Sequence, residues 1–275
     1  WVSRGPNNLG GRTRAFAFDI IDSETIIAGG VTAGIFKSVD GGQTFEKKMR
    51  PDQLHSITSI AQDKRPGKTN TWYAGTGEYY AIVSASSFSA QSSGNGIYKS
   101  IDNGESWELL PSTVSNTPQT MYSNRDFDFV WRIVTDHTNN QQDVVYAAVV
   151  NGIFRSEDGG ASWDVVLGLD TSINNRSDYT DIMITNSGVL YATIGRGSPS
   201  FGIYRSTDGV NWVEITPQGF PNSTRRIVMD YFEGDESQVV FLAETPNAGK
   251  NDHSLWHYKY LSGDGSGSNG QWDNR

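Results

Sequence analysis

One short pattern occurs four times in this chain, and it restricts the fold more than any other feature. Each copy reads Gly-Ile-aromatic-basic-Ser, followed by an acidic turn and then by an aromatic residue. The copies begin at Gly34, Gly96, Gly152 and Gly202, and their serines are 62, 56 and 50 residues apart. Units of this length that recur along a chain are typical of modules that pack against their sequence neighbours.

Two further β-rich runs precede each Gly-Ile segment. The first runs are residues 14–19, 57–63, 130–136, 181–186 and 226–231, and the second are 25–30, 71–75, 144–150, 189–195 and 239–245. A fifth unit has a degenerate third strand at 255–260 and no Ser-x-Asp turn. No segment of useful length has the period of a helix. Four short strands per unit predict an all-β propeller of four-stranded blades, about five of them in this chain.

The repeat also predicts the domain organisation. We expect a single propeller region over residues 1–275, with successive blades at 13–50, 51–115, 116–170, 171–220 and 221–275. Residues 1–12 are expected to form the outer strand of the closing blade, because their start resembles the outer strand at 107–111. The chain stops as the fifth outer strand begins, so we expect a fragment of a larger ring, with closure as five blades as the alternative.

The turn after each repeated serine has a structural explanation. A turn Asp accepts hydrogen bonds from backbone N–H groups that follow it, and a Ser hydroxyl fastens the other side. Glycine supplies a positive φ, and the aromatic side chain packs between sheets. The residues concerned are Ser38, Asp40, Gly42, Phe45, Ser100, Asp102, Gly104, Trp107, Ser156, Asp158, Gly160, Trp163, Ser206, Asp208 and Trp212. We therefore predict a role in folding for them, and not in catalysis.

This Ser-x-Asp-x-Gly-x-Thr/Ser-Trp/Phe turn resembles the Asp-box, also called the bacterial neuraminidase repeat. The resemblance implies a propeller similar to sialidases, xyloglucanases, sortilin-type receptor domains and photosystem assembly factors, with the Asp-box on the rim, away from the substrate face. Residues 5–15 and 73–78 resemble, more narrowly, sortilin-like propeller proteins secreted by Bacteroidetes as cargo of the type IX secretion pathway. That resemblance implies a secreted or cell-surface location.

The composition excludes several classes of partner. The 22 Lys and Arg are outnumbered by 31 Asp and Glu, for a net charge of −9, and the longest basic run is Lys47-Lys48. No broad phosphate-binding surface for nucleic acid is expected, nor an anionic membrane as partner. The chain has no Cys, which excludes disulfides, thiolate metal sites and Cys nucleophiles. No apolar run reaches the length of a transmembrane helix.

Candidate ligand contacts come from arginines near the inner strands and from two aromatic loops. Inner strands line the channel of a propeller, so the arginines there predict an anion site, with pairing to acidic neighbours as the alternative. The loops at 78–95 and 116–128 combine aromatic residues with Ser or Asn, which suits carbohydrate or protein contact, with a spacer as the alternative. The predicted contacts are Arg12, Arg14, Glu78, Tyr79, Tyr80, Tyr122 and Arg132, and Arg225 and Arg226 are further candidate arginines.

No catalytic residue is assigned. An inverting glycosidase needs two carboxylates about 6.5–9.5 Å apart. Asp19, Asp63, Asp136 and Asp230 recur at equivalent strand ends, which indicates turn chemistry instead. The sialidase arginine motif and the xyloglucanase catalytic signature are not recognisable. No cofactor is expected, although calcium is the alternative to a plain hairpin at residues 263–267.

The sequence therefore predicts a non-catalytic extracellular propeller module that binds protein or carbohydrate within a secreted or surface-attached bacterial protein. The alternative is a glycoside hydrolase of the sialidase or xyloglucanase type. It would show two opposed carboxylates, or a cluster of arginines, at the mouth of the central channel. A second alternative is a secretion-system cargo or an assembly factor that is bound to a partner complex.

Overall fold

The computed structural model describes residues 12–53, 55–79, 92–114, 126–150, 152–168, 177, 179–246 and 252–275. These residues form five four-stranded antiparallel sheets, each built from four consecutive strands. The proposed closing strand at 1–12 lies outside the described residues, apart from Arg12.

The first sheet contains β1 (Thr13–Phe18), β2 (Ile26–Gly30), β3 (Gly34–Ser38) and β4 (Glu46–Lys47), and the second contains β5 (Ile57–Gln62), β6 (Trp72–Thr76), β7 (Ile97–Ser100) and β8 (Glu108–Leu109). The third contains β9 (Val130–Thr135), β10 (Val145–Val149), β11 (Gly152–Ser156) and β12 (Asp164–Gly168). The fourth contains β13 (Thr180–Ile184), β14 (Leu190–Ile194), β15 (Gly202–Ser206) and β16 (Val213–Glu214). The fifth contains β17 (Ile227–Tyr231), β18 (Gln238–Glu244), β19 (His253–Tyr260) and β20 (Gly270–Asn274). Two short 3₁₀ helices, Pro111–Thr113 and Gly267–Asn269, complete the described structure.

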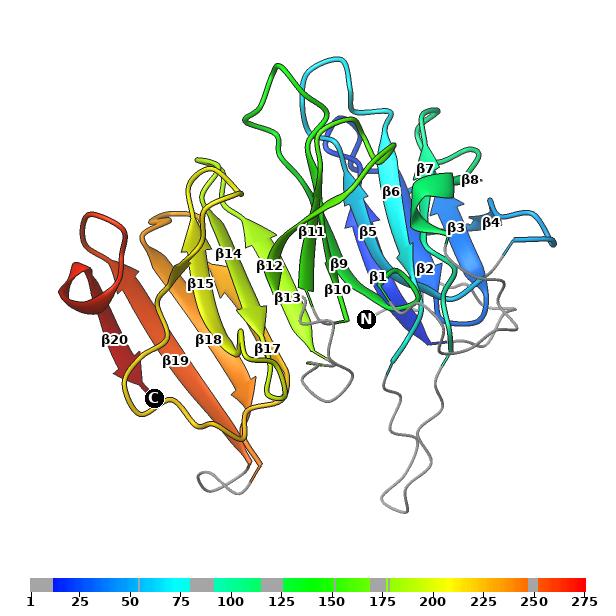
Figure 1. Ribbon diagram of the computed structural model, residues 1–275. Coiled ribbons are helices and arrows are strands. Elements are labelled where there is room, and N and C mark those ends of the chain that lie inside the picture. The colour runs from blue at the N-terminus through cyan, green and yellow to red at the C-terminus, as the bar shows by residue number, and fades with distance from the viewer. Residues whose placement is uncertain are drawn as a thin grey trace.

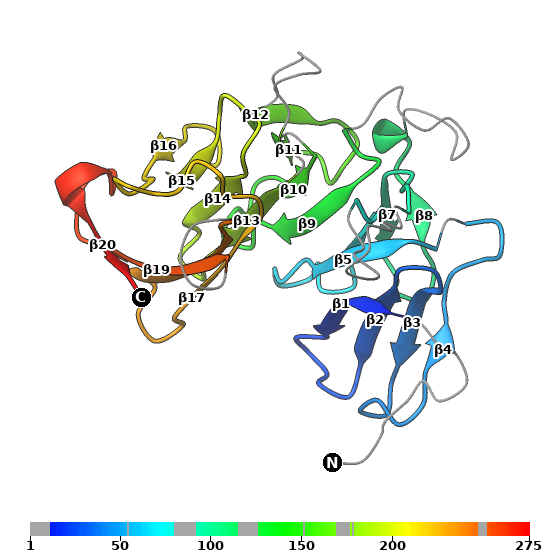
Figure 2. The same cartoon turned by 90° about the horizontal axis from the view of Figure 1, so that it is seen from below.

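The sheets follow one another along an arc, in the order of the chain (Figure 1). Seen from below, β1, β5, β9, β13 and β17 lie along the inner side of the arc, and the last strand of each sheet lies on the outer side (Figure 2). Each inner strand packs against the inner strand of the next sheet. The prediction of an all-β propeller with four-stranded blades is thereby confirmed.

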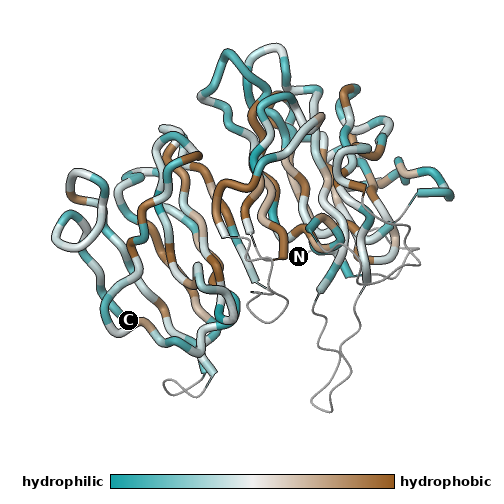
Figure 3. Tube along the Cα trace, viewed as in Figure 1, coloured by the Kyte–Doolittle hydropathy of each residue, from teal (hydrophilic) through white to brown (hydrophobic). Residues whose placement is uncertain are grey.

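The core lies between the sheets. Every residue of β2, β6, β10 and β14 is buried, because both faces of these middle strands pack against other side chains. Trp72 and Trp107 are almost fully buried in the cluster that joins the first sheet to the second. Hydrophobic residues accordingly concentrate along the strands, and hydrophilic residues in the connecting turns (Figure 3).

The four Ser-x-Asp turns share one hydrogen-bonding pattern. In the first, the Ser38 hydroxyl donates to Asp40 Oδ1 at 2.7 Å and accepts the N–H of Gly42 at 2.9 Å. Asp40 also accepts the backbone N–H and the hydroxyl of Thr44, at 2.9 and 2.6 Å. Equivalent bonds hold the other three turns. Each Asp carboxylate therefore accepts hydrogen bonds from its own turn, which follows the third strand of its sheet.

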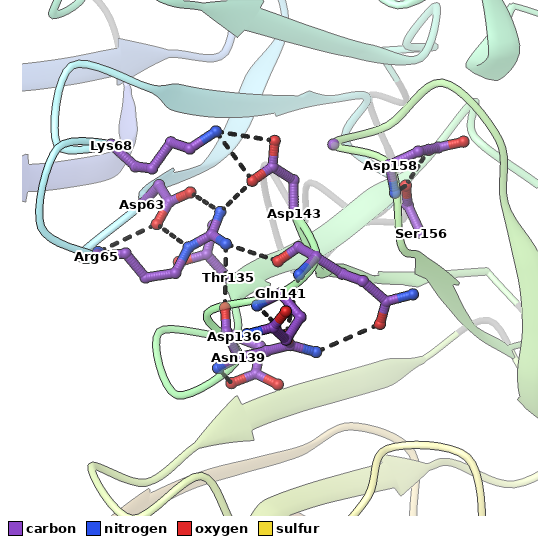
Figure 4. A network of polar contacts seen from close by, with 12 residues as sticks. Asp63, Arg65, Lys68, Thr135, Asp136, Asn139, Gln141, Asp143, Ser156 and Asp158 are labelled. Carbon is purple, nitrogen blue, oxygen red and sulfur yellow. Dashed lines mark hydrogen bonds and ion pairs between the residues drawn. The ribbon is translucent and has the colours of Figure 1, made fainter.

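A buried arginine joins the second sheet to the third. The guanidinium of Arg65 donates to Asp63 within its own loop and to Asp143 Oδ1 across the interface, at 2.7 Å (Figure 4). It also donates to the carbonyl oxygens of Asn139 and Gln142, at 3.0 and 2.6 Å. This network joins the loop after β5 to the loop after β9, and so links neighbouring ends of the two inner strands.

Candidate functional site

The inner strands surround a polar hollow of about 620 Å³. Its walls come from β1, β5 and β9, and Arg226, directly before β17, completes them. The lining residues are Thr13, Arg14, Ala15, Phe16, Thr58, Ser59, Ile60, Trp131, Arg132, Ile133, Val134 and Arg226. The inner strands are fixed by hydrogen bonds between sheets, for example from the Thr58 hydroxyl to the carbonyl of Val130 at 2.6 Å. The site is therefore built on rigid elements of the fold.

Three guanidinium groups converge on this hollow from three different sheets. Arg14 comes from β1, Arg132 from β9, and Arg226 from the residue before β17. The Arg226 guanidinium lies 4.8 Å from the centre of the Trp131 ring, a cation–π contact that orients it. Burial lowers the pKa of Arg14, and the charges of Arg226 and Arg12 lower it further. The positive charges are thus close enough to repel one another.

A buried carboxylate holds the first pair of arginines. The Glu78 side chain is fully buried, accepts a hydrogen bond from Arg12, and lies with Oε1 3.2 Å from Arg14 Nε. The sequence placed Arg12, Arg14 and Glu78 among the ligand contacts, and the fold brings these three together. Glu78 offers no acidic group to a ligand, because it is shielded by the two arginines.

A second buried carboxylate holds Arg132. Arg132 Nε lies 2.8 Å from Asp181 Oδ1, which also accepts the N–H of Ile182 at 3.0 Å. Asp181 Oδ2 is buried and has no hydrogen-bond partner among the residues that the structure describes. Burial is the largest influence on the pKa of Asp181 and raises it, against the opposing charges of Arg132 and Arg226.

Arg226 differs from the other arginines of the hollow. Within the described ranges, no Asp or Glu lies within ion-pair distance of its guanidinium, and its buried Nε has no hydrogen-bond acceptor. Burial lowers the pKa of Arg226, Asp181 raises it, and Arg132 lowers it. Arg225, the other candidate from this segment, instead pairs with Glu244 at 3.1 Å.

A second hollow, of about 390 Å³, lies farther along the inner strands. Arg132, Ile133 and Val134 line both hollows, and the second also contains Asp230, Tyr231 and Glu233. Arg132 therefore lies where the first hollow, whose charged residues are all arginines, meets the second, which is lined by both acidic and basic residues.

The aromatic candidates are placed elsewhere. Tyr79 packs edge-on against Phe129, with ring centres 5.0 Å apart, and does not line either inner-strand hollow. Tyr80 and Tyr122 lie outside the described residues, as do most of the two loops that carry them.

The recurrent strand-end aspartates are engaged in local structure. Asp19, Asp63 and Asp136 each accept the backbone N–H two residues on, at 2.8 to 3.1 Å. In the loop considered for calcium, Asp264 accepts hydrogen bonds from Ser266 and Asn269. Within the part of the chain that the structure describes, no group of three or more His, Asp or Glu is arranged to hold a metal ion. None of its helices is long and apolar enough to span a membrane.

Trp131 and Asp181 were not singled out in the sequence, and Arg226 was only a further candidate. The repeat itself could have identified Arg226 and Asp181, because each is the first residue of a first strand run. Arg14 and Arg226 both begin a first strand run, and Asp181 begins another. Equivalent positions in successive sheets face one channel, so aligning these run starts would have gathered the charged residues.

Comparison with known proteins supports the fold and a relation to carbohydrate-active propellers. No known family profile matches the chain. In an alignment that covers 70% of the chain, it is 25% identical to the xyloglucanase Xgh74A of Acetivibrio thermocellus, and the match covers 23% of that protein. An ancestral GH74 enzyme matches 97% of the chain with a TM-score of 0.70 and 23% identity, over 33% of its own length. YCF48 bound to D1 peptide matches 90% of the chain with a TM-score of 0.52 and 16% identity, over 65% of its own length.

The chain thus spans about a quarter of the xyloglucanase it matches. It is similar to part of a GH74-type propeller and shares its fold.

Proposed function

We propose that this chain is a non-catalytic propeller module that binds glycans in the hollow between its inner strands. The observation that carries the proposal is how two buried carboxylates hold the arginines of the hollow without lining it themselves. Glu78 is held by Arg12 and Arg14, and Asp181 by Arg132. Glycoside hydrolysis needs one carboxylic acid and one carboxylate that both reach the substrate. These two are engaged by arginines, so they suit the positioning of cations and not proton transfer.

The hollow suits a small saccharide. Its volume of about 620 Å³ lies within the range of roughly 300–1,000 Å³ that is common for ligand pockets. Fixed arginine, threonine and serine side chains around it match the hydroxyl and acidic groups of sugars. The similarity to a xyloglucanase adds support for a glycan over other ligands.

Glycan binding and glycan hydrolysis are distinguished by measuring both activities on the same mixtures of protein and glycan. The chain is titrated calorimetrically with xyloglucan, galactan and polygalacturonate, and the same mixtures are assayed for new reducing ends. We expect binding to at least one glycan and no release of reducing ends. Release would overturn the non-catalytic part, and absence of binding to all three would overturn the glycan part.

A blocking substitution tests the location. Thr13 is exposed and lines the hollow, so Thr13→Trp adds bulk at its wall. Gln43→Trp, in an exposed outer turn, is the matched control. Binding should be lost in the first variant and kept in the second. Equal binding by both variants would place the glycan elsewhere.

Two alternatives stand beside this proposal. A glycoside hydrolase of sialidase or xyloglucanase type is favoured by the arginines that converge on the hollow and by the GH74 similarity, and it predicts the release of reducing ends described above. A module bound to a partner complex is favoured by the fold shared with YCF48, whose structure holds D1 peptide. We further propose an extracellular location, and a sortilin-like cargo of the type IX pathway, on the resemblance of residues 5–15 and 73–78.

A further inference from the structure

The charges around the inner hollow do not balance. Three arginines line it, and among the described residues two buried carboxylates form ion pairs with two of them. Glu78 is shared between two arginines, and Asp181 is in contact with only one. The lining cations are Arg14, Arg132 and Arg226, whereas Arg12 pairs with Glu78 without lining the hollow. An excess of positive charge therefore remains where three sheets meet.

We propose that this excess charge binds the carboxylate of an acidic saccharide, such as a uronic acid residue, with Arg226 as its main contact and Arg14 and Arg132 beside it. The inference rests on the proposed glycan-binding function and names the class of glycan. It concerns a role for Arg226 that its contacts with the described residues leave unexplained.

The contacts of Arg226 argue for a ligand. A partly buried guanidinium normally lies against a carboxylate, because a desolvated charge without a partner costs free energy. Among the residues that the structure describes, Arg226 contacts the Trp131 ring and has no acceptor for its Nε, while Asp181 is engaged by Arg132. A ligand carboxylate in the hollow would supply the missing acceptors. Burial is the main cause of the lowered pKa of Arg14 and of Arg226, and repulsion by Arg226 and by Arg132, respectively, adds to it. A ligand carboxylate would offset that repulsion.

The geometry of arginine favours a planar anion. A guanidinium presents parallel N–H donors that match the two oxygens of a carboxylate. The contact with Trp131 limits the rotation of Arg226, so less side-chain freedom is lost when an anion binds. A saccharide would then place its hydroxyl groups against the strand residues Thr58 and Ser59, which line the same hollow.

The test compares sugars that differ only at the acidic group. The chain is titrated calorimetrically with trigalacturonate, with its methyl ester, and with neutral galactotriose. We expect trigalacturonate to bind at least about 10-fold more tightly than the other two, because they lack charge-assisted hydrogen bonds. Equal binding of all three sugars would overturn the proposal and leave the glycan-binding function intact. Binding of none, together with failure of the larger glycans, would overturn both.

The residue is tested with a matched pair of substitutions. Arg226→Gln keeps hydrogen-bond donors but removes the charge, and Arg226→Lys keeps the charge without the planar fork. Arg50→Gln is the control, because Arg50 is exposed and pairs with Glu108 at the outer strands. We expect trigalacturonate affinity to fall about 10- to 100-fold in Arg226→Gln, less in Arg226→Lys, and to stay unchanged in the control. Unchanged affinity in folded Arg226→Gln, as judged by its thermal unfolding, would overturn the assignment.

Other anions are separate outcomes. A glutamate-rich peptide and a sulfated galactan are titrated under the same conditions. If the peptide binds as tightly as trigalacturonate, the hollow recognises carboxylates without a saccharide, which overturns the saccharide part of the proposal. If the sulfated sugar binds and trigalacturonate does not, the carboxylate assignment is wrong.

Discussion

The ammonium group of Lys99, in the second sheet, donates a hydrogen bond to the carbonyl oxygen of Gly159, in the turn of the third sheet, at 2.8 Å. One sheet earlier, Lys37 makes the same kind of bond to the carbonyl oxygen of Asn103, at 2.7 Å. In the first two copies, the basic residue of the repeated Gly-Ile-aromatic-basic-Ser segment therefore connects its own sheet to the next turn along the chain. Arg155, in the third copy, instead bonds to Tyr146 and Glu157 of its own sheet.

Loss of this connection should destabilise the fold. In Lys99→Met the side-chain stem remains, and the hydrogen bond across the interface is removed. We expect the free energy of unfolding to fall by about 1.5–3 kcal/mol, which is typical for a hydrogen bond that involves a charged group. Urea denaturation measures the change. Lys47→Met, at an exposed position of β4, is the control, and equal losses in both variants would contradict a connecting role.

The loss of stability when a turn glycine is replaced by alanine should depend on which atoms the new methyl group would contact. Gly104 and Gly67 both have φ of 79°, so alanine is strained equally at either position. A methyl group at Gly104 would lie 2.5 Å from Ile27 Cδ1 of the preceding sheet, whereas a methyl group at Gly67 meets nothing within 4 Å. Gly104→Ala should therefore cost about 1–3 kcal/mol more than Gly67→Ala. Equal unfolding free energies for the two variants would show that packing of the turn against Ile27 is loose.

The outer turns should make stability depend on acid pH. Hydrogen bonds from the Thr44 hydroxyl, the Thr44 N–H and the Ser38 hydroxyl lower the pKa of Asp40 to about 2. The folded state thus favours the ionised carboxylate. Its contribution is complete above the pKa of the unfolded chain, near 4, and is lost as the pH falls through about 2.

The measurement is the thermal midpoint between pH 5 and pH 2. In Asp40→Asn the midpoint should fall less steeply over this range than in the unsubstituted chain. Asp52→Asn is the control, because Asp52 is exposed and its side chain pairs with Arg50. Parallel curves for Asp40→Asn and the unsubstituted chain would show that the turn does not prefer the charged form.

Arg65 and Asp63, in the buried network between the second and third sheets, should show a large coupling energy in the free energy of unfolding. Arg65→Met leaves the buried Asp63 without its main partner, and we expect a loss of about 3–5 kcal/mol in unfolding free energy. Asp63→Asn on the same background removes the uncompensated charge and should recover part of that loss. A double-mutant cycle from urea denaturation gives the coupling, and simple additivity would argue against a direct interaction.

The fold was predictable because it is repeated. The first strands expected at 57–63 and 130–136 are observed as β5 (Ile57–Gln62) and β9 (Val130–Thr135), and glycines such as Gly42 have the positive φ that the turn requires. Local rules of this kind act within a few residues. The burial of the aromatic residue after the turn varies more than expected, since Trp107 is almost fully buried whereas Phe45 is only half-buried.

The candidate site was predictable only in part. Arg12, Arg14 and Glu78 were expected near a ligand, but their mutual ion pairs depend on how the first sheet packs against the second. The approach of Arg226 to Trp131 joins residues that are 95 positions apart, and it follows from the angle between sheets and not from any local pattern. Sequence periodicity fixes which face of a strand is inward, while the distance across the channel is set by packing.

The positive hollow lies within a chain of net charge −9, and this contrast has a consequence for binding rates. An acidic ligand is repelled at long range by the whole molecule and attracted only close to the inner arginines. Salt screens charges more strongly as their separation increases, over a Debye length of about 10 Å at 0.1 M. Moderate salt should therefore speed the encounter of ligand and protein even as it shortens the lifetime of the complex, so that kinetics and affinity respond to ionic strength in opposite directions.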